Sequence, residues 1–350
     1  MQTNLLLTLR DRVRNASNTV TPAAKRLAEV VRDPTNDKTT RLKAFDELVE
    51  LEVGDTSLAR ARGLERATGI SKLYLKYEGD NPTGTQKDRI AFAQVRSALA
   101  AAKSTIALAT CGNYGVAVAL AANLAGLTCR IFIPAGYHTE REAEMTNLGA
   151  VVSRLAGSYE EVVAQSSVLA KAEGWSDANP GDRNATLQLK AYSTIGNEIN
   201  KMLPVPADWC AVPVSNGTLL AGIYQGLNGP TKMLAGSSTR KNPIVQSYLA
   251  GHARCTDLDP QKITETIVNE PLINWHAFDG DHAINALRQS NGGAVNVSDK
   301  NLLATAALVK KTEGYNVLPA STAGLFGLLK MHELQSLELG VYVAVLTARR

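Results

Sequence analysis

The chain has 350 residues, of which 45% are hydrophobic and 20% charged, so it is long enough for two domains or one large one. Its 37 basic and 33 acidic residues leave a net charge of +4 and a sequence pI near 8.8, without a basic tail or stripe, so we predict no nucleic-acid partner. The four cysteines form no CxxC pair and do not cluster with the five histidines, which argues against a metal site and a disulfide framework.

The first 50 residues are predicted to form a helical extension, because apolar residues recur at helical spacing over 23–31 and 42–51. The opening segment, MQTNLLLTLRDRVRNAS, contains a short apolar run followed directly by charged residues. This run is too short for a signal peptide or a membrane span. We therefore expect a cytoplasmic protein with no membrane partner, and the cysteine pattern favours a reducing compartment.

After Gly54 the sequence changes to short apolar runs that alternate with amphipathic stretches. The apolar runs predict strands over residues 73–78, 105–110, 128–134, 209–214, 231–237 and 341–347. The stretches between them predict helices over residues 87–102, 114–125, 159–172, 219–227, 299–312 and 323–334. Strands that alternate with helices form βαβ units, so we predict an α/β fold whose parallel sheet is covered on both faces.

Lys87 lies in NPTGTQKDR (81–89), which follows a predicted strand and opens a long helical stretch. The turn formers Pro82 and Gly84 indicate a strand-to-helix junction. The positive end of the helix dipole disfavours a second positive charge at such a junction and favours a neutral, nucleophilic amine. On this segment alone, a surface lysine and a reactive lysine both remain open.

Two further strand-to-helix turns are built from small residues, TCGN (110–113) and SNGT (215–218). Backbone N–H groups at helix starts attract carboxylate and phosphate groups. A purely structural turn is the alternative for each. Neither turn fits GxGxxG or GxxxxGK[ST], which argues against a dehydrogenase or a kinase. The last predicted strand ends at Thr347, and ligands of parallel sheets bind beyond the carboxyl ends of strands, so we expect Thr347 beside the two turns.

Taken in order, these segments resemble the fold type II pyridoxal-phosphate-dependent enzymes, the tryptophan synthase β-like family, and among its members threonine synthase most. NPTGTQKDR resembles the lysine motif NPTGSFKDR, TCGNYG (110–115) resembles SSGNTG, and VPVSNGTLLAGI (212–223) resembles the phosphate loop. LPASTAGLFGLL (318–329) resembles EPASAAALAGL, and VAVLT (343–347) resembles VVVLTG. The resemblance runs from about Val53 to Thr347 and implies pyridoxal 5'-phosphate as the cofactor.

The resemblance implies that Lys87 is the Schiff-base partner of the cofactor and the general base and acid at Cα. It implies that Asn113 hydrogen-bonds the ring hydroxyl oxygen and that the Thr347 hydroxyl meets the pyridine nitrogen. A neutral hydroxyl there makes the ring a weaker electron sink, which favours elimination and replacement over transamination. The residues implied for the cofactor phosphate are Ser215, Asn216, Gly217, Thr218 and Leu219. The residues implied for the substrate are Thr110, Cys111, Gly112, Tyr114 and Arg183.

The resemblance also implies two open parallel-sheet domains, each a three-layer αβα arrangement, with the cofactor in the cleft between them. The large cofactor-binding domain would comprise residues 1–84 and 188–350, with residues 1–50 as its helical N-terminal extension. The small mobile domain would comprise residues 85–187 and carry the Asn113 loop. A homodimer is expected on the same grounds.

Departures from the family pattern concentrate where the substrate should bind. Tyr114 stands in place of a threonine that, in threonine synthases, helps to hold the distal group of the substrate, and Cys111 replaces a serine. We interpret Cys111 as a small lining residue rather than a nucleophile. Arg183, in NPGDRN (179–184), falls close to a family arginine suited to a substrate phosphate, with a surface arginine as the alternative. Ala348 replaces the glycine after VVVLT.

We therefore predict a pyridoxal-phosphate-dependent lyase similar to threonine synthase, a carbon–oxygen lyase acting on phosphates. Its leading substrate is O-phosphohomoserine, converted to threonine and phosphate, and O-phosphoserine comes next. An alternative is a β-replacement or β-elimination enzyme similar to cysteate synthase, cysteine synthase or threonine dehydratase, which needs a leaving group at Cβ only. A second alternative is a non-catalytic paralogue that binds the cofactor, against which the joint retention of Lys87, Asn113 and Thr347 argues.

Overall fold

The computed structural model describes residues 20–335 and 337–350, and the chain divides into two compact units. The first unit comprises the chain up to Val53, Asn81–Thr83 and Lys87–Asn179, and the second comprises Gly54–Asp80, Gly84–Gln86 and Pro180–Arg350. The sequence-based expectations for residues 1–19 lie outside the described residues.

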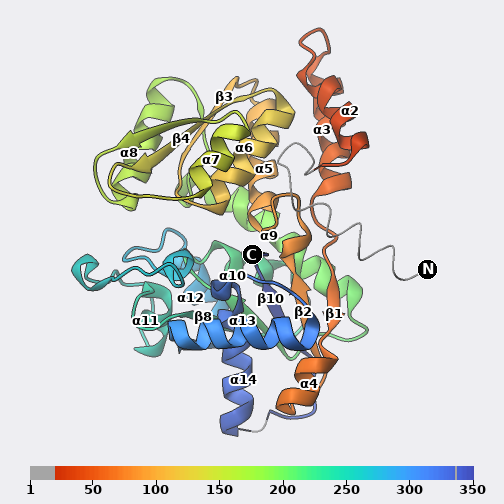
Figure 1. Cartoon of the computed structure of the whole chain (residues 1–350), viewed down its shortest axis with the longest axis vertical. Coiled ribbons are helices and arrows are strands. Elements are labelled where there is room, and N and C mark those ends of the chain that lie inside the picture. Colours follow the sequence, from red (N-terminus) through yellow and green to blue (C-terminus); the bar gives the residue numbers. More distant parts are fainter. Residues whose placement is uncertain (1–19, 336) are drawn as a thin grey trace. The chain divides into compact units, whose positions relative to one another are not determined.

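A four-stranded parallel sheet in the order β5-β4-β3-β6 forms the centre of the first unit. Its strands are β3 (Thr105–Ala109), β4 (Thr128–Pro134), β5 (Val151–Leu155) and β6 (Ser176–Asp177). Its helices are α2 (Pro22–Arg32), α3 (Lys38–Glu52), α5 (Lys87–Ala100), α6 (Asn113–Ala125), α7 (Arg141–Asn147) and α8 (Tyr159–Ala172). Helix α8 packs against β3, β4 and β6, while α6 packs against β4, α5 and α7 (Figure 1). The central strands β3 and β4 are almost wholly buried, as their apolar sequences predict.

The N-terminal helices α2 and α3 belong to the first unit, whereas we expected residues 1–50 to extend the large domain. Helix α2 packs against α6, and α3 packs against α5. Phe45 of α3 stacks on Phe92 with ring centroids 6.0 Å apart, and the Arg32 guanidinium donates to Asn123 Oδ1 at 2.7 Å. The apolar faces of α2 and α3 are thus buried by α5 and α6, which the sequence alone does not reveal.

The second unit contains a six-stranded sheet in the order β1-β2-β10-β7-β8-β9, in which β1 is antiparallel to β2 and the other pairs are parallel. Its strands are β1 (Leu58–Arg60), β2 (Leu73–Tyr77), β7 (Trp209–Pro213), β8 (Lys232–Ser238), β9 (Gly293–Val297) and β10 (Tyr342–Leu346). Its helices are α4 (Arg62–Thr68), α9 (Ala185–Met202), α10 (Thr218–Gly226), α11 (Pro243–Leu249), α12 (Gly280–Gln289), α13 (Asp299–Glu313) and α14 (Ala323–Gln335). Because β10 and β7 are parallel neighbours, the residues that follow them lie at one edge of the sheet.

The α/β class is confirmed, and all six predicted strands are present with bounds that agree within one residue. The eight predicted helices are also present, as α2, α3, α5, α6, α8, α10, α13 and α14. The boundary expected at residue 187 differs, because residues 180–187 already belong to the second unit. The reason is α9, which starts at Ala185 and packs along α10.

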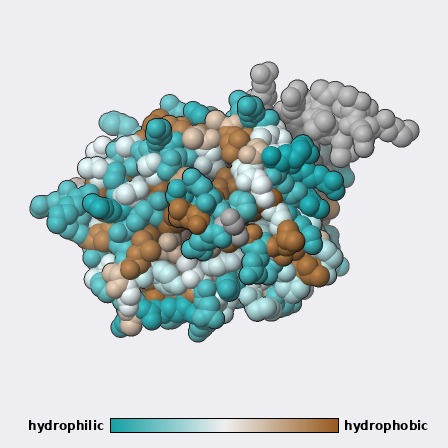
Figure 2. All heavy atoms as spheres, turned by 90° about the horizontal axis from the view of Figure 1, so that it is seen from below, coloured by the Kyte–Doolittle hydropathy of each residue, from teal (hydrophilic) through white to brown (hydrophobic). Residues whose placement is uncertain are grey.

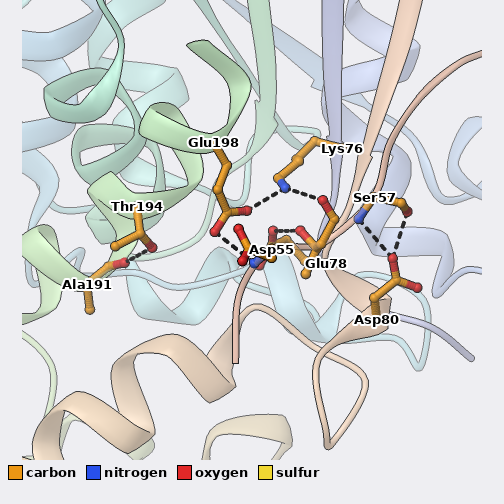
Figure 3. Close-up of polar contacts among 9 residues, drawn as sticks. Asp55, Ser57, Lys76, Glu78, Asp80, Ala191, Thr194 and Glu198 are labelled. Carbon is orange, nitrogen blue, oxygen red and sulfur yellow. Dashed lines mark hydrogen bonds and ion pairs between the residues drawn. The ribbon is translucent and has the colours of Figure 1, made fainter. Parts of the chain in front are cut away.

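A buried ion pair joins β2 to α9 in the second unit (Figure 3). Lys76 is fully buried, and its Nζ lies 2.5 Å from Glu198 Oε2 and 2.6 Å from Thr56 O. The Thr56 hydroxyl donates to Glu78 Oε1 at 2.7 Å, and the Asp55 N–H donates to Glu198 Oε1 at 3.1 Å. The ammonium group is therefore held by one carboxylate, that of Glu198, and one backbone carbonyl, that of Thr56, and it is itself fully buried.

We expect Lys76→Met to lower the free energy of unfolding by about 3 to 5 kcal/mol, because the carboxylate of Glu198 loses its cation in a buried place. Urea unfolding followed by tryptophan fluorescence measures the loss. The double variant Lys76→Met/Glu198→Leu should recover most of it, because it removes the uncompensated charge as well. A loss below about 1 kcal/mol for the single variant would show that the pair behaves as an exposed one.

The surface carries apolar side chains from separate elements. Among the described residues, the exposed ones include Leu51 of α3, Met202 of α9, Leu249 of α11 and the loop residues Ile267 and Leu339. On the face shown in Figure 2, apolar side chains form small groups among polar ones. Such scattered residues are normal on a folded protein. No helix in the described part of the chain has the length and apolar character needed to cross a membrane.

Candidate active site

Lys87 is the first residue of α5, as the sequence predicted. Within the first unit, the turn before it is held by Asp88, whose side chain is fully buried. The N–H and the hydroxyl of Thr83 each donate to Asp88 Oδ2 at 2.9 Å. The lysine amine therefore extends from a backbone that is fixed on its N-terminal side.

In the second unit, the segment Gly84–Gln86 pairs with the residues after β10. Thr85 forms an antiparallel bridge with Ala348, and the Gln86 N–H donates to Thr347 O at 3.0 Å. The Arg349 N–H donates to Gly84 O at 3.0 Å. Ala348, which departs from the family glycine, takes part in this pairing with its side chain buried. The residue directly before Lys87 is thus bonded to the end of the central strand β10.

The predicted TCGN turn connects β3 to α6, with Gly112 as the N-cap of the helix. The side chains of Thr110 and Cys111 are buried, and Asn113 is half-buried. The Thr110 hydroxyl accepts a hydrogen bond from the Gly112 N–H at 3.4 Å. As the sequence predicted, the turn presents the start of a helix, where backbone N–H groups favour a carboxylate.

Tyr114 lies close to Lys87 within the first unit. Its side chain is buried, and its hydroxyl donates to Ala178 O at 2.8 Å. The Lys87 Nζ lies 5.6 Å from the centre of the Tyr114 ring, within the range of a cation–π contact. The phenol proton is therefore committed to the backbone, and the aromatic face rather than the hydroxyl lies toward the amine.

Residues 215–219 form a turn between β7 and α10 whose shape requires glycine. Gly217 is the N-cap of α10 with a φ of +95°, in the left-handed region. A Cβ there would lie 2.8 Å from Asp279 O. The first bond within the helix runs from the Ala221 N–H to Gly217 O at 3.1 Å, so the earlier N–H groups of α10 have no acceptor inside the helix. This turn fits a phosphate group.

Thr347 directly follows β10, and its hydroxyl meets that of Ser321. The two oxygens are 2.9 Å apart, and both side chains are buried. Ser321 Oγ also accepts the Ala348 N–H at 2.7 Å, which fixes the position of the pair. Ser321 was not among the predicted site residues, although it lies in the segment LPASTAGLFGLL that carried part of the resemblance.

Arg183 lies in the short 3-10 helix Asp182–Asn184 of the second unit, with its side chain exposed. The preceding Gly181 packs closely on Phe278, because a Cβ at Gly181 would lie 2.9 Å from the Phe278 Cβ. The Phe278 N–H in turn lies 3.5 Å from Asn216 Oδ1 in the predicted phosphate turn. The Arg183 turn is thus packed against the segment that supports residues 215–219.

The cysteines differ in environment and all four are free thiols. Burial raises the pKa of Cys129 and of Cys210 from 9.0 to about 12, and it raises the pKa of Cys255 to about 11. These thiols stay protonated at neutral pH and are therefore poor nucleophiles.

No group of three or more His, Cys, Asp or Glu side chains within 20–335 and 337–350 is arranged to hold a metal ion.

Because their thiols are buried, we expect Cys129 and Cys210 to lower the free energy of unfolding in alkali. Cys129 and Cys210 keep their protons in the folded chain and release them more readily when unfolded, so their contribution is complete below the unfolded pKa of 9.0 and is lost as pH rises through the folded value of about 12. Thermal unfolding midpoints between about pH 8 and about pH 11 measure the decline. Replacing both cysteines by alanine should make the decline less steep without abolishing it, because burial also raises the pKa of Cys255 and of Tyr77. An unchanged slope would contradict the assignment.

In the two units taken separately, the chain presents a lysine amine beside an aromatic face, two helix-start turns and a pair of buried hydroxyls. A turn that only glycine permits, at the start of a nine-residue helix, suits a phosphate-bearing ligand. A lysine at a helix start suits covalent attachment to a carbonyl group. The residues therefore fit a phosphorylated aldehyde.

Comparisons with known proteins agree with this chemistry. Residues 49–348 match the family model described as pyridoxal-phosphate dependent enzyme. The threonine synthase of Methanosarcina acetivorans is 31% identical over 303 residues, covering 82% of this chain and 72% of that protein. Among solved structures, maize serine racemase aligns with a TM-score of 0.72 at 20% identity over 95% of both chains. The processed form of threonine deaminase isoform 2 from Solanum lycopersicum aligns with a TM-score of 0.72 at 19% identity over 92% of this chain and 88% of that one.

Proposed function

The chain belongs to the family of pyridoxal-phosphate-dependent enzymes, with the type II fold, and we propose that it is a lyase that converts O-phosphohomoserine and water to threonine and phosphate. The observation that carries this proposal is the hydrogen bond from the Gln86 N–H, next to Lys87, to Thr347 O. It supports a common role for the lysine and the buried Ser321–Thr347 hydroxyl pair, which are far apart in sequence.

Pyridoxal phosphate, when bound, supplies an aldehyde for amines and an electron sink that acidifies the Cα–H bond of an amino acid. In our proposal the Lys87 amine holds the cofactor and then moves a proton at Cα as base and acid. Residues 215–219 would hold the phosphate with backbone N–H groups, and Asn113 would hydrogen-bond the ring hydroxyl. The Thr347 hydroxyl would meet the ring nitrogen. Its hydrogen bond with Ser321 orients it, and because a hydroxyl is neutral it would not hold the ring nitrogen protonated, which favours elimination and replacement over transamination.

The substrate carboxylate would bind at the N–H groups of the turn 110–113, which opens α6. This fixes the α-amino group relative to the lysine. Arg183 is the candidate for the phosphate at the far end of the substrate, because the residue is exposed and a guanidinium is suited to bidentate phosphate contacts.

A second function, β-elimination or β-replacement on O-phosphoserine or threonine, is favoured by Tyr114. Its phenol already donates to Ala178 O, so it does not offer the hydroxyl that a threonine at this position would give to a distal group. A phenol ring at this position would also leave less room for a longer, Cγ-substituted substrate than a threonine side chain would. A substrate with its leaving group at Cβ is shorter by one carbon.

Substrate assays in parallel separate the two functions. The enzyme is incubated with O-phosphohomoserine, O-phosphoserine and threonine, and released phosphate, ammonia and the amino acid product are measured by colorimetry and mass spectrometry. Threonine from O-phosphohomoserine supports the first function. Inert O-phosphohomoserine together with turnover of O-phosphoserine or threonine rejects it in favour of the second.

Tyr114→Thr is expected to raise the kcat/KM for O-phosphohomoserine relative to O-phosphoserine by about tenfold, because it restores room and a free hydroxyl for the distal group. Tyr114→Phe is the matched control, since it keeps the ring and removes only the bond to Ala178. We expect the Phe variant to keep the wild-type ratio. Equal ratios for the Thr variant and wild type would show that Tyr114 does not select the substrate.

We also propose a homodimer that works in the cytoplasm. The family resemblance supports the dimer, and the four free thiols are compatible with a reducing compartment. Light scattering on the purified chain gives the mass directly. A mass of one chain at micromolar concentration would reject the dimer.

A further inference from the structure

Two polar side chains of the turn 215–219, those of Asn216 and Thr218, are engaged by the protein itself. The Thr218 hydroxyl donates to the carboxylate of Asp279, which is only 2% exposed. Asn216 Oδ1 accepts from Asn274 Nδ2 at 3.0 Å, and Asn216 O accepts the Asp279 N–H at 3.0 Å. These hydrogen bonds direct both side chains toward residues 274–279, so the Thr218 hydroxyl and Asn216 Oδ1 are committed to the protein.

A relay of asparagines extends this support to α11. Asn242 is fully buried and is the N-cap of α11, where its Oδ1 accepts the N–H groups of Ile244 and Val245 at 3.1 and 3.2 Å. Its Nδ2 therefore faces the other way, and it donates to Ser215 O at 2.9 Å and to Asn274 Oδ1 at 3.0 Å. Because the helix cap fixes which end of the Asn242 amide faces α11, it also fixes which groups donate and which accept from Asn242 through Asn274 to the turn.

Steric contacts complete the enclosure of the turn. A Cβ added to Gly217 would lie 2.8 Å from Asp279 O, 2.9 Å from Ala283 Cβ and 2.9 Å from Ile244 Cδ1. Gly217 is therefore in close contact with α11, α12 and the residue that precedes α12. Very little movement of the turn is possible without moving these elements as well.

We propose that Asn242, Asn274 and Asp279 are positioning residues that preform the phosphate site. They hold residues 215–219 so that the N–H groups at the start of α10 converge on one anion before the cofactor binds. Asp279 acts through Thr218, whose hydroxyl it keeps away from the phosphate. This inference rests on the proposed role of the turn as the cofactor phosphate site.

The test compares two ligands that differ only in the phosphate. Affinities for pyridoxal 5'-phosphate and for pyridoxal are measured by absorbance titration on the full chain, freed of cofactor by dialysis against hydroxylamine. The ratio of the affinity for pyridoxal 5'-phosphate to the affinity for pyridoxal isolates the contribution of the phosphate site. Loss of folded protein or damage elsewhere weakens the binding of both ligands alike and leaves this ratio unchanged. We expect Asp279→Leu and Asn274→Leu each to lower the ratio by about 10- to 100-fold.

A conservative variant and a matched control show whether a change in the affinity ratio comes from the hydrogen bonds to the turn. Asp279→Asn should keep the ratio within about threefold, because its amide oxygen still accepts from Thr218. Asn269→Ala is the control, since Asn269 is also buried in the second unit but its Oδ1 accepts the Thr266 N–H rather than a donor of the turn. The ³¹P chemical shift of bound cofactor should move in Asn274→Leu and stay in Asn269→Ala, which gives a readout if Asp279→Leu does not fold.

The outcomes separate this inference from the proposed function. A wild-type chain that binds pyridoxal as tightly as pyridoxal phosphate rejects the turn as the phosphate site. A wild-type preference for the phosphate that persists unchanged in folded Asp279→Leu and Asn274→Leu keeps the phosphate site and overturns the positioning role.

Discussion

Lys87→Ala will lower turnover of every substrate of this enzyme by at least about 1,000-fold, because it removes the amine that, in our proposal, holds the cofactor and moves the proton at Cα. The structure gives the physical basis: Lys87 opens α5, and its Nζ lies over the Tyr114 ring. Turnover is measured by phosphate and ammonia release at saturating pyridoxal phosphate. Saturation ensures that weaker cofactor binding alone does not account for the loss.

Two variants separate the chemistry of the amine from its charge. Lys87→Arg keeps the positive charge, but a guanidinium does not take over the role of the amine as base, so we expect it to be as inactive as Lys87→Ala. Lys103→Ala removes a lysine of the same unit that donates to Gly174 O on the surface, and it should leave turnover unchanged. Lys87→Ala with more than about a tenth of wild-type turnover would reject the assigned role.

Gly217→Ala is expected to lower the preference for pyridoxal phosphate over pyridoxal by about 100-fold. A φ of +95° is strained for a residue with a Cβ, and that Cβ would lie 2.8 Å from a backbone oxygen that has no freedom to rotate away. The turn must therefore shift, and the N–H groups at the start of α10 lose their common direction. Paired titrations with the two ligands measure the effect.

Gly251→Ala is the matched control for Gly217→Ala. Gly251 has a φ of +76°, but a Cβ there meets no atom of the described residues within 4 Å. It therefore reports the cost of the left-handed backbone alone, and the ligand preference should stay at its wild-type value. If Gly217→Ala also kept that preference, the turn would not be the phosphate site.

The fold was predictable where the sequence pattern is local and the element is buried. The central strands β3, β4, β7 and β10 are mainly apolar and buried, so their limits in the sequence agree with those in the structure within one residue. The strands β5 and β9 were missed, since they are only partly buried and carry mixed residues. A partly exposed strand has a weaker hydrophobic signal than a central one.

Helix α9 was missed because tertiary packing overrides a weak local preference. Its interior contains Gly196, which lowers intrinsic helix propensity. The glycine is needed there, since a Cβ would lie 2.4 Å from Ile223 O of α10. The helical pattern of α2 and α3 was evident from the sequence. Their packing partners, α5 and α6, could not be predicted, because they are set by the three-dimensional fold.

The candidate site was predictable as far as its residues lie in short motifs. Lys87, Asn113 and the turn 215–219 could be proposed from the sequence because turn residues follow strand candidates there, and Thr347 could be proposed because it ends a strand candidate. The sequence did not point to the residues that support this turn, Asn242, Asn274 and Asp279. Each bonds a residue about 30 to 60 positions away, and no local pattern marks such a long-range bond. Tyr114 was identified, but its bond to Ala178 and its position beside Lys87 needed coordinates.

The covalent link between Lys87 and pyridoxal phosphate is the central claim, and peptide mapping after borohydride reduction tests it most directly. The holoenzyme is reduced with sodium borohydride, which makes the link permanent, and is digested with trypsin for mass spectrometry. We predict one modified peptide, residues 77–89, with the reduced cofactor on Lys87 and cleavage at that lysine blocked. A cofactor found on another lysine, or wild-type protein without any covalent adduct, would contradict the account.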